Sequence, residues 1–387
     1  MNRKLYDETM KLFRGHFGCD PEVVAYAPGR VEVIGNHTDY NEGYVLSAAI
    51  NYGTFFAIAK NDGPECRLVA GDLMHEVRFP VDDPKPVSED TWANYCMGVH
   101  AGLLKLGAFP RGFKGLFLGD IPQGAGLSSS AALEVTTGLA IARLYGIDAT
   151  RLDFAKIGQK AEHTFAGVKC GLLDQISSIF GAENMLVKTD FRSLAVENVP
   201  LGAECVLLVC KSNAKHALVD GAYNQRREDC EAAAAYFGGV LGHPVKALRD
   251  VSWAEWEAHR GGLPERVANR AAHPIGEDER VIEGAALLAK GDVAGFGKLM
   301  YASHESSVKY FENSCEELDA LVAISKTVDG VLGARLSGGG FGGSVVALVR
   351  RDCADAAAKA IAKAYESKYG RACDILSIVP SRGAFIV

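Results

Sequence analysis

A short stretch near the N-terminus gathers polar side chains that could bind a small ligand. The segment "APGRVEVIGNHTDYNEGYVLSAAI" has two apolar, β-rich runs, and between them lie Arg30, Asn36, His37, Asp39 and Asn41. Glycine, asparagine and aspartate are also common in solvated turns. A cation, an imidazole, a carboxylate and two amides so close together nevertheless favour a binding loop held between two strands.

A second stretch, "GDIPQGAGLSSSAALEV", contains the parts of a phosphate-binding loop. Gly124 and Gly126 permit positive φ and a close approach of backbone to a ligand. Three serines, Ser128 to Ser130, then open a helix whose free N–H groups and dipole attract anions. No Lys-Ser/Thr pair follows the glycines, so the stretch is not a Walker P-loop. Taken alone, a phosphate cradle and an ordinary helix cap after a tight turn explain it equally well.

Two carboxylates follow on predicted helices. Glu162 lies inside "KAEHTF", and Asp174 lies in the first turn of the next helix. Asp174 points away from that helix's apolar stripe. An acidic residue in a first turn also complements the helix dipole, and Glu162 also fits an exposed helix position. Neither carboxylate identifies a site by itself.

A third glycine run, "LSGGGFGGSVV", satisfies the GxGxxG spacing with Gly338, Gly340 and Gly343. A dinucleotide-binding fingerprint requires a helix after the glycines. The β-branched run "SVVALV" that follows predicts a strand instead. We therefore reject a dinucleotide site.

The elements that position these motifs change character along the chain. The first part is rich in predicted strands, followed by helices, whereas the second part is mainly helical and ends in two strands flanking a helix. Thr150 and Asp153 have the spacing of a capping box at the start of a helix. This order predicts an α+β protein with two domains, residues 1–200 and 201–387. The predicted helices are one that carries Leu5 to Phe17 and ends before Gly18, then 92–106, 129–145, 150–165, 171–180, several within 220–310, 315–327 and 353–369.

Composition excludes several classes of function. The 387 residues carry 41 basic and 48 acidic side chains, a net charge of −7, which disfavours nucleic acid or a membrane surface as partner. No apolar run approaches the roughly 20 residues of a membrane span, and the N-terminus has no apolar signal core. The ten cysteines form no CxxC pair. We expect a cytoplasmic protein with reduced thiols.

Three motifs in this order resemble the signature motifs of the GHMP kinase superfamily: "PGRVEVIGNHTDYNEGYVL", "PQGAGLSSSAAL" and "LSGGGFGGS". The first resembles the galactokinase family in particular, as do "AEHTFAGVKCGLLDQ", "SNAKHALVDGAYNQRR", "SHESSVKYFENSCEELD" and "PSRGA". The resemblance covers nearly the whole chain. It implies an N-terminal domain like domain 2 of ribosomal protein S5, a ferredoxin-like C-terminal domain and an active site in the cleft between them.

The resemblance also implies a reaction, the transfer of the γ-phosphoryl group of ATP to the anomeric hydroxyl of a hexose with Mg²⁺. Sugar and ATP are then the expected partners, and the oligomeric state stays open. It implies that Asp174 is the catalytic carboxylate and Arg30 the cation facing the phosphoryl group, and that the sugar-binding residues are Asn36, His37, Thr38, Asp39 and Tyr223. The residues implied around the phosphates are Gly124, Ala125, Gly126, Leu127, Ser128, Ser129 and Ser130. Ser130 and Glu162 are the implied Mg²⁺ ligands, and residues 338–343 would close the cleft.

Two positions depart from the family pattern. Galactokinases usually have glutamate where this chain has Asn36, and proline where it has Ser47. A carboxylate only accepts hydrogen bonds, whereas an amide also donates, so the 6-position of the sugar could be bound differently. Galactose is the expected substrate, with N-acetylgalactosamine, arabinose or galacturonate as alternatives. A non-catalytic sugar sensor is a further alternative, but the chain keeps the three serines and Asp174.

Overall fold

The protein is described by a computed structural model that covers residues 2–107, 111–122, 124–214 and 219–387. Gln123 of the second motif and residues 215–218 of "SNAKHALVDGAYNQRR" lie outside the described residues. The chain divides into two units. The first unit contains Met1–Arg30, Ala49–Ala182 and Ser381–Val387, and the second contains Val31–Ala48 and Glu183–Pro380.

This division differs from a single boundary at residue 200. The two longest strands, β1 (Val23–Ile34) and β2 (Tyr44–Lys60), each belong partly to both units. The start of β2 pairs with β6 inside the second unit (Tyr44 opposite Asp190), and the C-terminal strand β12 pairs with β1 inside the first (Ala25 opposite Ile386). The domain boundary at residue 200 therefore remains a prediction.

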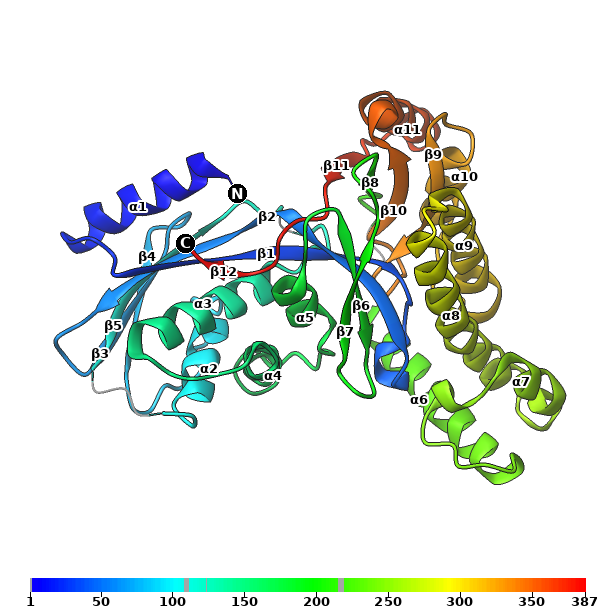
Figure 1. Ribbon diagram of the computed structural model, residues 1–387, viewed down its shortest axis with the longest axis horizontal. Coiled ribbons are helices and arrows are strands. Elements are labelled where there is room, and N and C mark those ends of the chain that lie inside the picture. The colour runs from blue at the N-terminus through cyan, green and yellow to red at the C-terminus, as the bar shows by residue number, and fades with distance from the viewer. Residues whose placement is uncertain (1, 108–110, 123, 215–218) are drawn as a thin grey trace. The chain divides into compact units, whose positions relative to one another are not determined.

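The first unit is a sheet covered by helices on both faces (Figure 1). Strand β5 pairs antiparallel with β2 and parallel with β3, and β3 continues antiparallel to β4. Helix α1 packs on one face through Leu5 and Phe13, which share a core with Phe55 and Leu116 of the sheet. The elements of this unit, besides β1 and β2, are α1 (Arg3–Phe17), β3 (Glu65–Ala70), β4 (His75–Pro80), α2 (Ala93–Leu103), β5 (Phe113–Gly119), α3 (Ser129–Tyr145), α4 (Arg151–Ala161), a π-helix (Glu162–Ala166), α5 (Leu173–Phe180) and β12 (Phe385–Ile386).

The helices that carry the second motif and the two carboxylates begin near the predicted residues. Thr150 and Asp153 form the predicted capping box at the start of α4. Helix α3 ends at Gly146, which adopts a left-handed conformation as C-cap. Glu162 lies where α4 widens into the π-helix, and Asp174 lies in the first turn of α5. Local sequence signals therefore predicted these three helices correctly.

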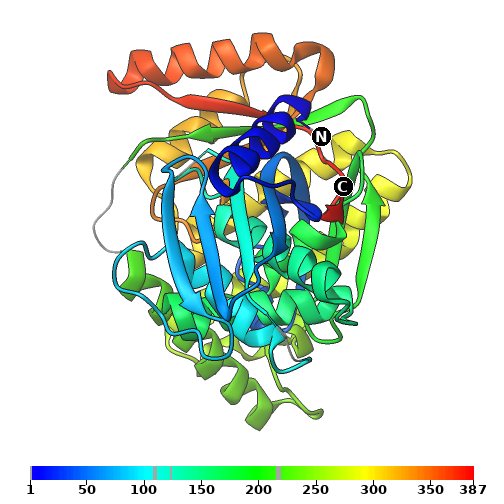
Figure 2. The same ribbon diagram turned by 90° about the vertical axis from the view of Figure 1, so that its left-hand side faces the viewer.

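The second unit combines an antiparallel sheet with a group of helices. The sheet has the order β11-β8-β10-β9, and α10 and α11 pack on one face through Leu318, Leu321, Ile361 and Tyr365. In Figure 2 the orange-red helix α11 runs along the red strand β11 and the green strand β8. The strand predicted after the third glycine run is present as β10. The elements are a 3₁₀-helix (Asp39–Asn41), β6 (Met185–Asp190), β7 (Val196–Pro200), β8 (Cys205–Lys211), α6 (Val219–Val240), α7 (Trp253–His259), α8 (Glu265–Ala289), α9 (Val293–Ser306), a π-helix (Ser307–Phe311), α10 (Glu316–Ser325), β9 (Val331–Ser337), β10 (Ser344–Arg350), α11 (Ala354–Tyr369) and β11 (Asp374–Ile378).

Two further observations bear on the sequence predictions. All ten cysteines are free thiols in this structure. Within the described part of the chain, none of the helices combines the length and the apolarity that a membrane span requires.

Candidate active site

The glycine–serine loop, residues 124–130, lies between β5 and α3 in the first unit and includes the first two residues of α3. Gly124 and Gly126 have φ of 68° and 69°, which confirms that both glycines adopt the left-handed conformation. Ser128 also has a positive φ, 55°, which is uncommon for a residue with a side chain. Ala125 and Leu127 are buried, so their side chains anchor the loop while Gly124, Gly126 and Ser129 remain exposed. The exposed residues Gly124, Gly126 and Ser129 are therefore accessible to an anion at the N-terminus of α3.

An arginine, a carboxylate and a serine meet beside this loop. Arg30 Nε donates to Asp174 Oδ1 at 2.7 Å, and Arg30 Nη1 donates to the carbonyl oxygen of Gly126 at 2.6 Å. The Ser128 hydroxyl donates to Asp174 Oδ2. The structure thus brings together three residues predicted for separate roles, and both oxygens of Asp174 are held in place. It also places the Ser128 side chain on the carboxylate, whereas the sequence assigned it to the phosphates.

Glu162 and Ser130 also lie together. Glu162 is 4% exposed, which excludes the alternative of an exposed helix position. Burial raises the pKa of Glu162, and hydrogen bonds from the Cys170 thiol and the Ser130 hydroxyl oppose that change. The nearby negative charge of Asp174 raises it further. A buried carboxylate beside a hydroxyl and a second carboxylate suits a hard divalent cation, so these residues fit Mg²⁺.

Sequence reasoning missed a second buried acid in this region. Glu134 of α3 is 1% exposed, and its Oε2 accepts a hydrogen bond from Gln175 Nε2 at 2.8 Å. Burial raises the pKa of Glu134 well above its ordinary value, and the charges of Glu162 and Asp174 add to the effect. Oε1 of Glu134 and Oε1 of Gln175 both lack a hydrogen-bond partner among the residues that the structure covers. A proton on Glu134 would complete a two-point pair of carboxylic acid and amide. The signal was available, since Glu134 is the lone charge in the apolar run "AALEV".

A neutral Glu134 leads to a testable expectation. Glu134→Gln preserves the two-point pairing because its amide donates where the carboxylic acid would, so we expect kcat within about twofold of wild type. Glu134→Ala instead leaves Gln175 without this partner and costs about 1–3 kcal/mol of stability. The unfolded chain releases the Glu134 proton at lower pH than the folded chain, so wild-type stability falls as pH rises above the ordinary glutamate pKa. The free energy of unfolding of Glu134→Gln, minus that of the wild type, should therefore increase with rising pH. The increase is at most about 1.4 kcal/mol per pH unit.

Urea unfolding of both proteins between about pH 5 and 8 measures this difference. The titratable groups around Glu134 are Glu162, Asp174, Tyr95, Cys96 and Cys170. All five are common to both proteins, so the comparison isolates position 134. A stability difference that is independent of pH would show that Glu134 is ionised in the folded protein.

An aromatic pocket adjoins the start of α3 in the first unit. Its volume is about 230 Å³, and Trp92, Tyr95 and Phe117 line it together with Ser129 and Ser130. Aromatic and apolar walls suit a flat heterocycle, and the two serines belong to the glycine–serine loop. The pocket can therefore hold the base of a nucleotide whose phosphates lie at the loop.

In the second unit, the polar loop comprises residues 35–43. Its backbone is held from outside by Glu277 of α8, whose Oε2 accepts from the N–H groups of Gly35 at 2.9 Å and Asn36 at 3.0 Å. Burial would raise the pKa of Glu277, but the charge of Arg280 and other nearby cations hold it well below the ordinary value. The Thr38 hydroxyl contacts the carbonyl oxygens of Gly35 at 2.7 Å and Tyr44 at 2.6 Å. Thr38 therefore closes the loop in this structure. No sequence pattern distinguishes Glu277, because many other charged residues surround it on α8.

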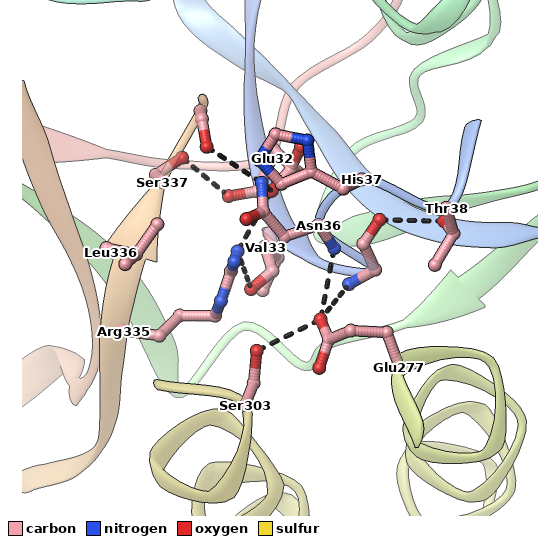
Figure 3. Close-up of polar contacts among 12 residues, drawn as sticks. Glu32, Val33, Asn36, His37, Thr38, Glu277, Ser303, Arg335, Leu336 and Ser337 are labelled. Atoms are coloured by element: carbon pink, nitrogen blue, oxygen red, sulfur yellow. Dashed lines mark hydrogen bonds and ion pairs between the residues drawn. The ribbon is translucent and has the colours of Figure 1, made fainter. Parts of the chain in front are cut away.

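The Asn36 side chain lies inside this network rather than at its surface (Figure 3). Asn36 is 2% exposed, and its Nδ2 donates to Glu32 Oε1 at 3.0 Å and to the carbonyl oxygen of Gly338 at 2.7 Å. Its Oδ1 accepts from Asn313 Nδ2 at 3.2 Å. The sequence suggested that these amide hydrogens could bind the 6-position of a sugar. In the structure they are donated to acceptors within the protein.

The other predicted sugar-binding residues lie around His37. Burial lowers the pKa of His37 to about 3, so the ring is neutral at physiological pH. The His37 ring lies 5.4 Å from that of Tyr223, centre to centre, and Tyr40 hydroxyl and His37 Nδ1 are 3.0 Å apart. Tyr223 and Asp39 are half-buried, and Asp39 begins the 3₁₀-helix of the loop. The structure therefore brings His37 and Tyr223 together and places Asp39 on the same loop.

The third glycine run also contacts the polar loop, within the second unit. His37 Nε2 lies 3.3 Å from the carbonyl oxygen of Gly339, and Asn313 Nδ2 donates to the same oxygen at 3.3 Å. Gly338, Gly340 and Gly343 all have positive φ. The run between β9 and β10 thus supports the polar loop directly.

Comparisons with known proteins agree over most of the chain. The galactokinase galactose-binding signature matches residues 11–60, the GHMP kinase N-terminal domain matches 94–182 and the GHMP kinase C-terminal domain matches 285–367. The chain is 41% identical to a galactokinase of Haemophilus influenzae over 90% of this chain and 91% of that protein. It is 38% identical to a galactokinase of Roseiflexus over 95% of this chain and 94% of that protein.

Solved structures give the same result. A galactokinase of Lactococcus lactis, complexed with galactose, superposes with a TM-score of 0.90 at 31% identity and covers 98% of this chain and 99% of its own. A mevalonate kinase of Methanococcus jannaschii superposes with a TM-score of 0.64 at 19% identity, over 93% of this chain and 98% of its own. The second likeness shows the shared fold only.

Proposed function

The chain belongs to the galactokinase family of the GHMP kinases, and on this premise we propose that it transfers the γ-phosphoryl group of ATP to the anomeric hydroxyl of galactose. The products are galactose 1-phosphate and ADP. The observation that carries the proposal is the group of Arg30, Asp174 and Ser128 beside the glycine–serine loop. Phosphoryl transfer depends on positioning and charge neutralisation, which a cation, a carboxylate and a phosphate loop supply.

Each residue then has a defined task in the transfer. The glycine–serine loop, residues 124–130, binds the phosphates, and the aromatic pocket around Trp92 and Tyr95 binds the base. Asp174 orients the sugar hydroxyl and accepts its proton as the new O–P bond forms and the bond to the ADP oxygen breaks. Arg30 neutralises negative charge on the phosphoryl group during transfer.

A magnesium ion bound by Ser130 and Glu162 would neutralise phosphate charge. The hydroxyl–carboxylate pair supports this assignment, because Mg²⁺ keeps several water ligands and needs few from the protein. We expect the remaining sugar contacts to come from the polar loop and Tyr223. A non-catalytic sensor would need the same residues for binding. It would not need Asp174 to be oriented by hydrogen bonds from Arg30 and Ser128.

Sugar turnover tests the proposal directly. The purified protein is assayed for ADP release with ATP, Mg²⁺ and galactose, N-acetylgalactosamine, arabinose or galacturonate. We expect kcat/KM for galactose to exceed that of each other sugar by at least about tenfold, and phosphorus NMR to identify a sugar 1-phosphate. A faster reaction with another sugar would make the protein a different GHMP sugar kinase. Binding of ATP and galactose without ADP release would make it a sensor.

A further inference from the structure

Helix α8 holds the start of the polar loop through Glu277. This side chain is fully buried, and its Oε2 accepts hydrogen bonds from the N–H groups of Gly35 and Asn36 and, at 3.0 Å, from the Ser303 hydroxyl. Its Oε1 pairs with Arg280 Nε at 2.6 Å. Figure 3 shows the Glu277 carboxylate between Ser303 and the loop. Both oxygens of this carboxylate are therefore engaged, and its charge is compensated.

The next residue of α8, Asp278, holds the other end of the same loop. It is 8% exposed, and its Oδ1 accepts from the N–H group of Tyr44 at 2.7 Å. Gly43 lies so close to Asp278 that a Cβ atom at position 43 would meet both carboxylate oxygens, Oδ2 at 2.7 Å. The φ of Gly43 lies outside the left-handed region, so space rather than backbone conformation calls for glycine here. Asp278 is thus in direct contact with the loop backbone.

The two ends held by α8 also contact each other. The Thr38 hydroxyl bridges the carbonyl oxygens of Gly35 and Tyr44. A Cβ atom on Gly35 would lie 2.5 Å from the same carbonyl oxygen of Tyr44. The loop therefore begins and ends at one place, against two consecutive residues of α8. The side chains between these ends, among them His37 and Asp39, depend on this closure for their positions.

Asp278 can perform this task without a charge. Its pKa is raised to about 7, mainly by burial and also by the charges of Glu277 and Asp190. The hydrogen bond from Tyr44 and the charge of Arg249 oppose this change. Oδ2 of Asp278 has no hydrogen-bond partner in the described part of the chain. Contact with the Tyr44 N–H group therefore needs one acceptor oxygen and the same shape, which asparagine also provides.

We propose that Asp278 is a positioning residue that, together with Glu277, clamps the two ends of the polar loop to α8 and so fixes the shape of the sugar site. The inference rests on the proposed sugar kinase activity, because that activity makes the polar loop the sugar site. The loop lies within the matched galactose-binding signature, whereas Asp278 and Glu277 lie outside all three matched regions. Neither carboxylate has to touch the sugar, since each acts through the backbone of the loop.

A double-mutant cycle between Gly43 and Asp278 tests the clamp. Gly43→Ala places a methyl group against the carboxylate and should raise KM for galactose on the order of tenfold. Asp278→Ala leaves the Tyr44 N–H group without its acceptor and should raise this KM about tenfold as well. In Gly43→Ala/Asp278→Ala the methyl group occupies space that the carboxylate has left. We therefore expect KM to rise at most about tenfold in the double variant. A rise of about a hundredfold, the product of two independent losses, would overturn the clamp.

Three comparisons separate positioning from general loss of fold. In each variant kcat and KM for ATP should stay within about threefold of wild type, because the glycine–serine loop belongs to the first unit. Asp278→Asn keeps the acceptor for Tyr44, so its KM for galactose should also stay within about threefold of wild type. Glu283→Ala, at an exposed position of α8, is the control and should behave as wild type. Equal rises in the KM values for ATP and galactose, or a tenfold rise in Asp278→Asn, would contradict the proposal.

A smaller substitution covers the case in which Asp278→Ala does not fold. Asp278→Ser vacates most of the space of the carboxylate and retains a hydroxyl oxygen, so it replaces Asp278→Ala in the cycle. The same dependence is then expected: Gly43→Ala should cost less in the Asp278→Ser background than in wild type. An equal cost in both backgrounds would overturn the clamp.

Calorimetry with galactose keeps this proposal distinct from the proposed function. The Kd for galactose should change in the variants as KM does. If the wild type binds galactose without releasing ADP, the kinase proposal fails, and the Kd values still test the clamp. If Kd is the same in wild type, Gly43→Ala and Asp278→Ala, the clamp fails although turnover continues. If another sugar is phosphorylated fastest, the cycle is measured with that sugar, and if no sugar of the panel binds, both proposals fail.

Discussion

Asp174→Asn is expected to lower kcat by about 10²–10⁴-fold while ATP and galactose still bind. The amide keeps the size of the side chain and can still accept from Arg30 Nε, but it cannot take the proton of the sugar hydroxyl. It also places an NH₂ group opposite the Ser128 hydroxyl or Arg30, where the structure has a carboxylate oxygen. The loss should therefore appear in kcat much more than in either KM, because the proton is transferred late in a loose transition state.

Steady-state kinetics and calorimetry with each ligand check this expectation. Asp355→Asn is a matched control, since Asp355 is an exposed aspartate in the first turn of another helix, α11. It should leave kcat and both KM values unchanged. If Asp174→Asn loses binding of both ligands, Asp174 is mainly a structural residue that holds Arg30 and the glycine–serine loop.

Glu162→Ala is expected to raise the Mg²⁺ concentration for half-maximal activity by at least about tenfold and to lower kcat on the order of a hundredfold. The substitution removes the carboxylate from the proposed metal site and leaves the Ser130 hydroxyl without its partner. The fold should persist, because a buried carboxylate with a raised pKa contributes little to stability when no cation compensates it.

Activity titrated with Mg²⁺ and the far-UV circular dichroism spectrum provide the two readouts. Glu257→Ala, at an exposed position of α7, is the control for the loss of a glutamate on a helix. Wild-type activity of Glu162→Ala at low Mg²⁺ would remove Glu162 from the metal site. Unfolding of Glu162→Ala would instead assign this buried side chain a structural role.

Local features were the predictable part of this protein. The left-handed glycines of the glycine–serine loop, the capping box of Thr150 and Asp153, and the strand after Gly343 depend on residues close in sequence. Their conformations follow from steric limits and local hydrogen bonds, which act within a few residues. The motifs also identified the residues that meet beside the loop, although not which of their atoms form hydrogen bonds with one another.

Contacts between distant residues could not be predicted in the same way. The sequence placed Ser128 at the phosphates and Asn36 at the sugar, whereas the structure engages Ser128 with Asp174 and Asn36 with Glu32 and Gly338. Sequence patterns report which residue types are present, but a hydrogen bond also requires a direction and a distance. These depend on how the elements pack.

The sequence by itself determined the family, the order of the motifs and the local conformations that build a phosphate loop. Only the tertiary structure decided the partners of the buried charges: Glu134 with Gln175, 41 positions away, and Glu32 with Arg335, 303 positions away. The physical reason is that burial removes water as a hydrogen-bond partner, so each buried polar group must find one in the protein. Which group it finds depends on packing between elements that the chain brings together from far apart.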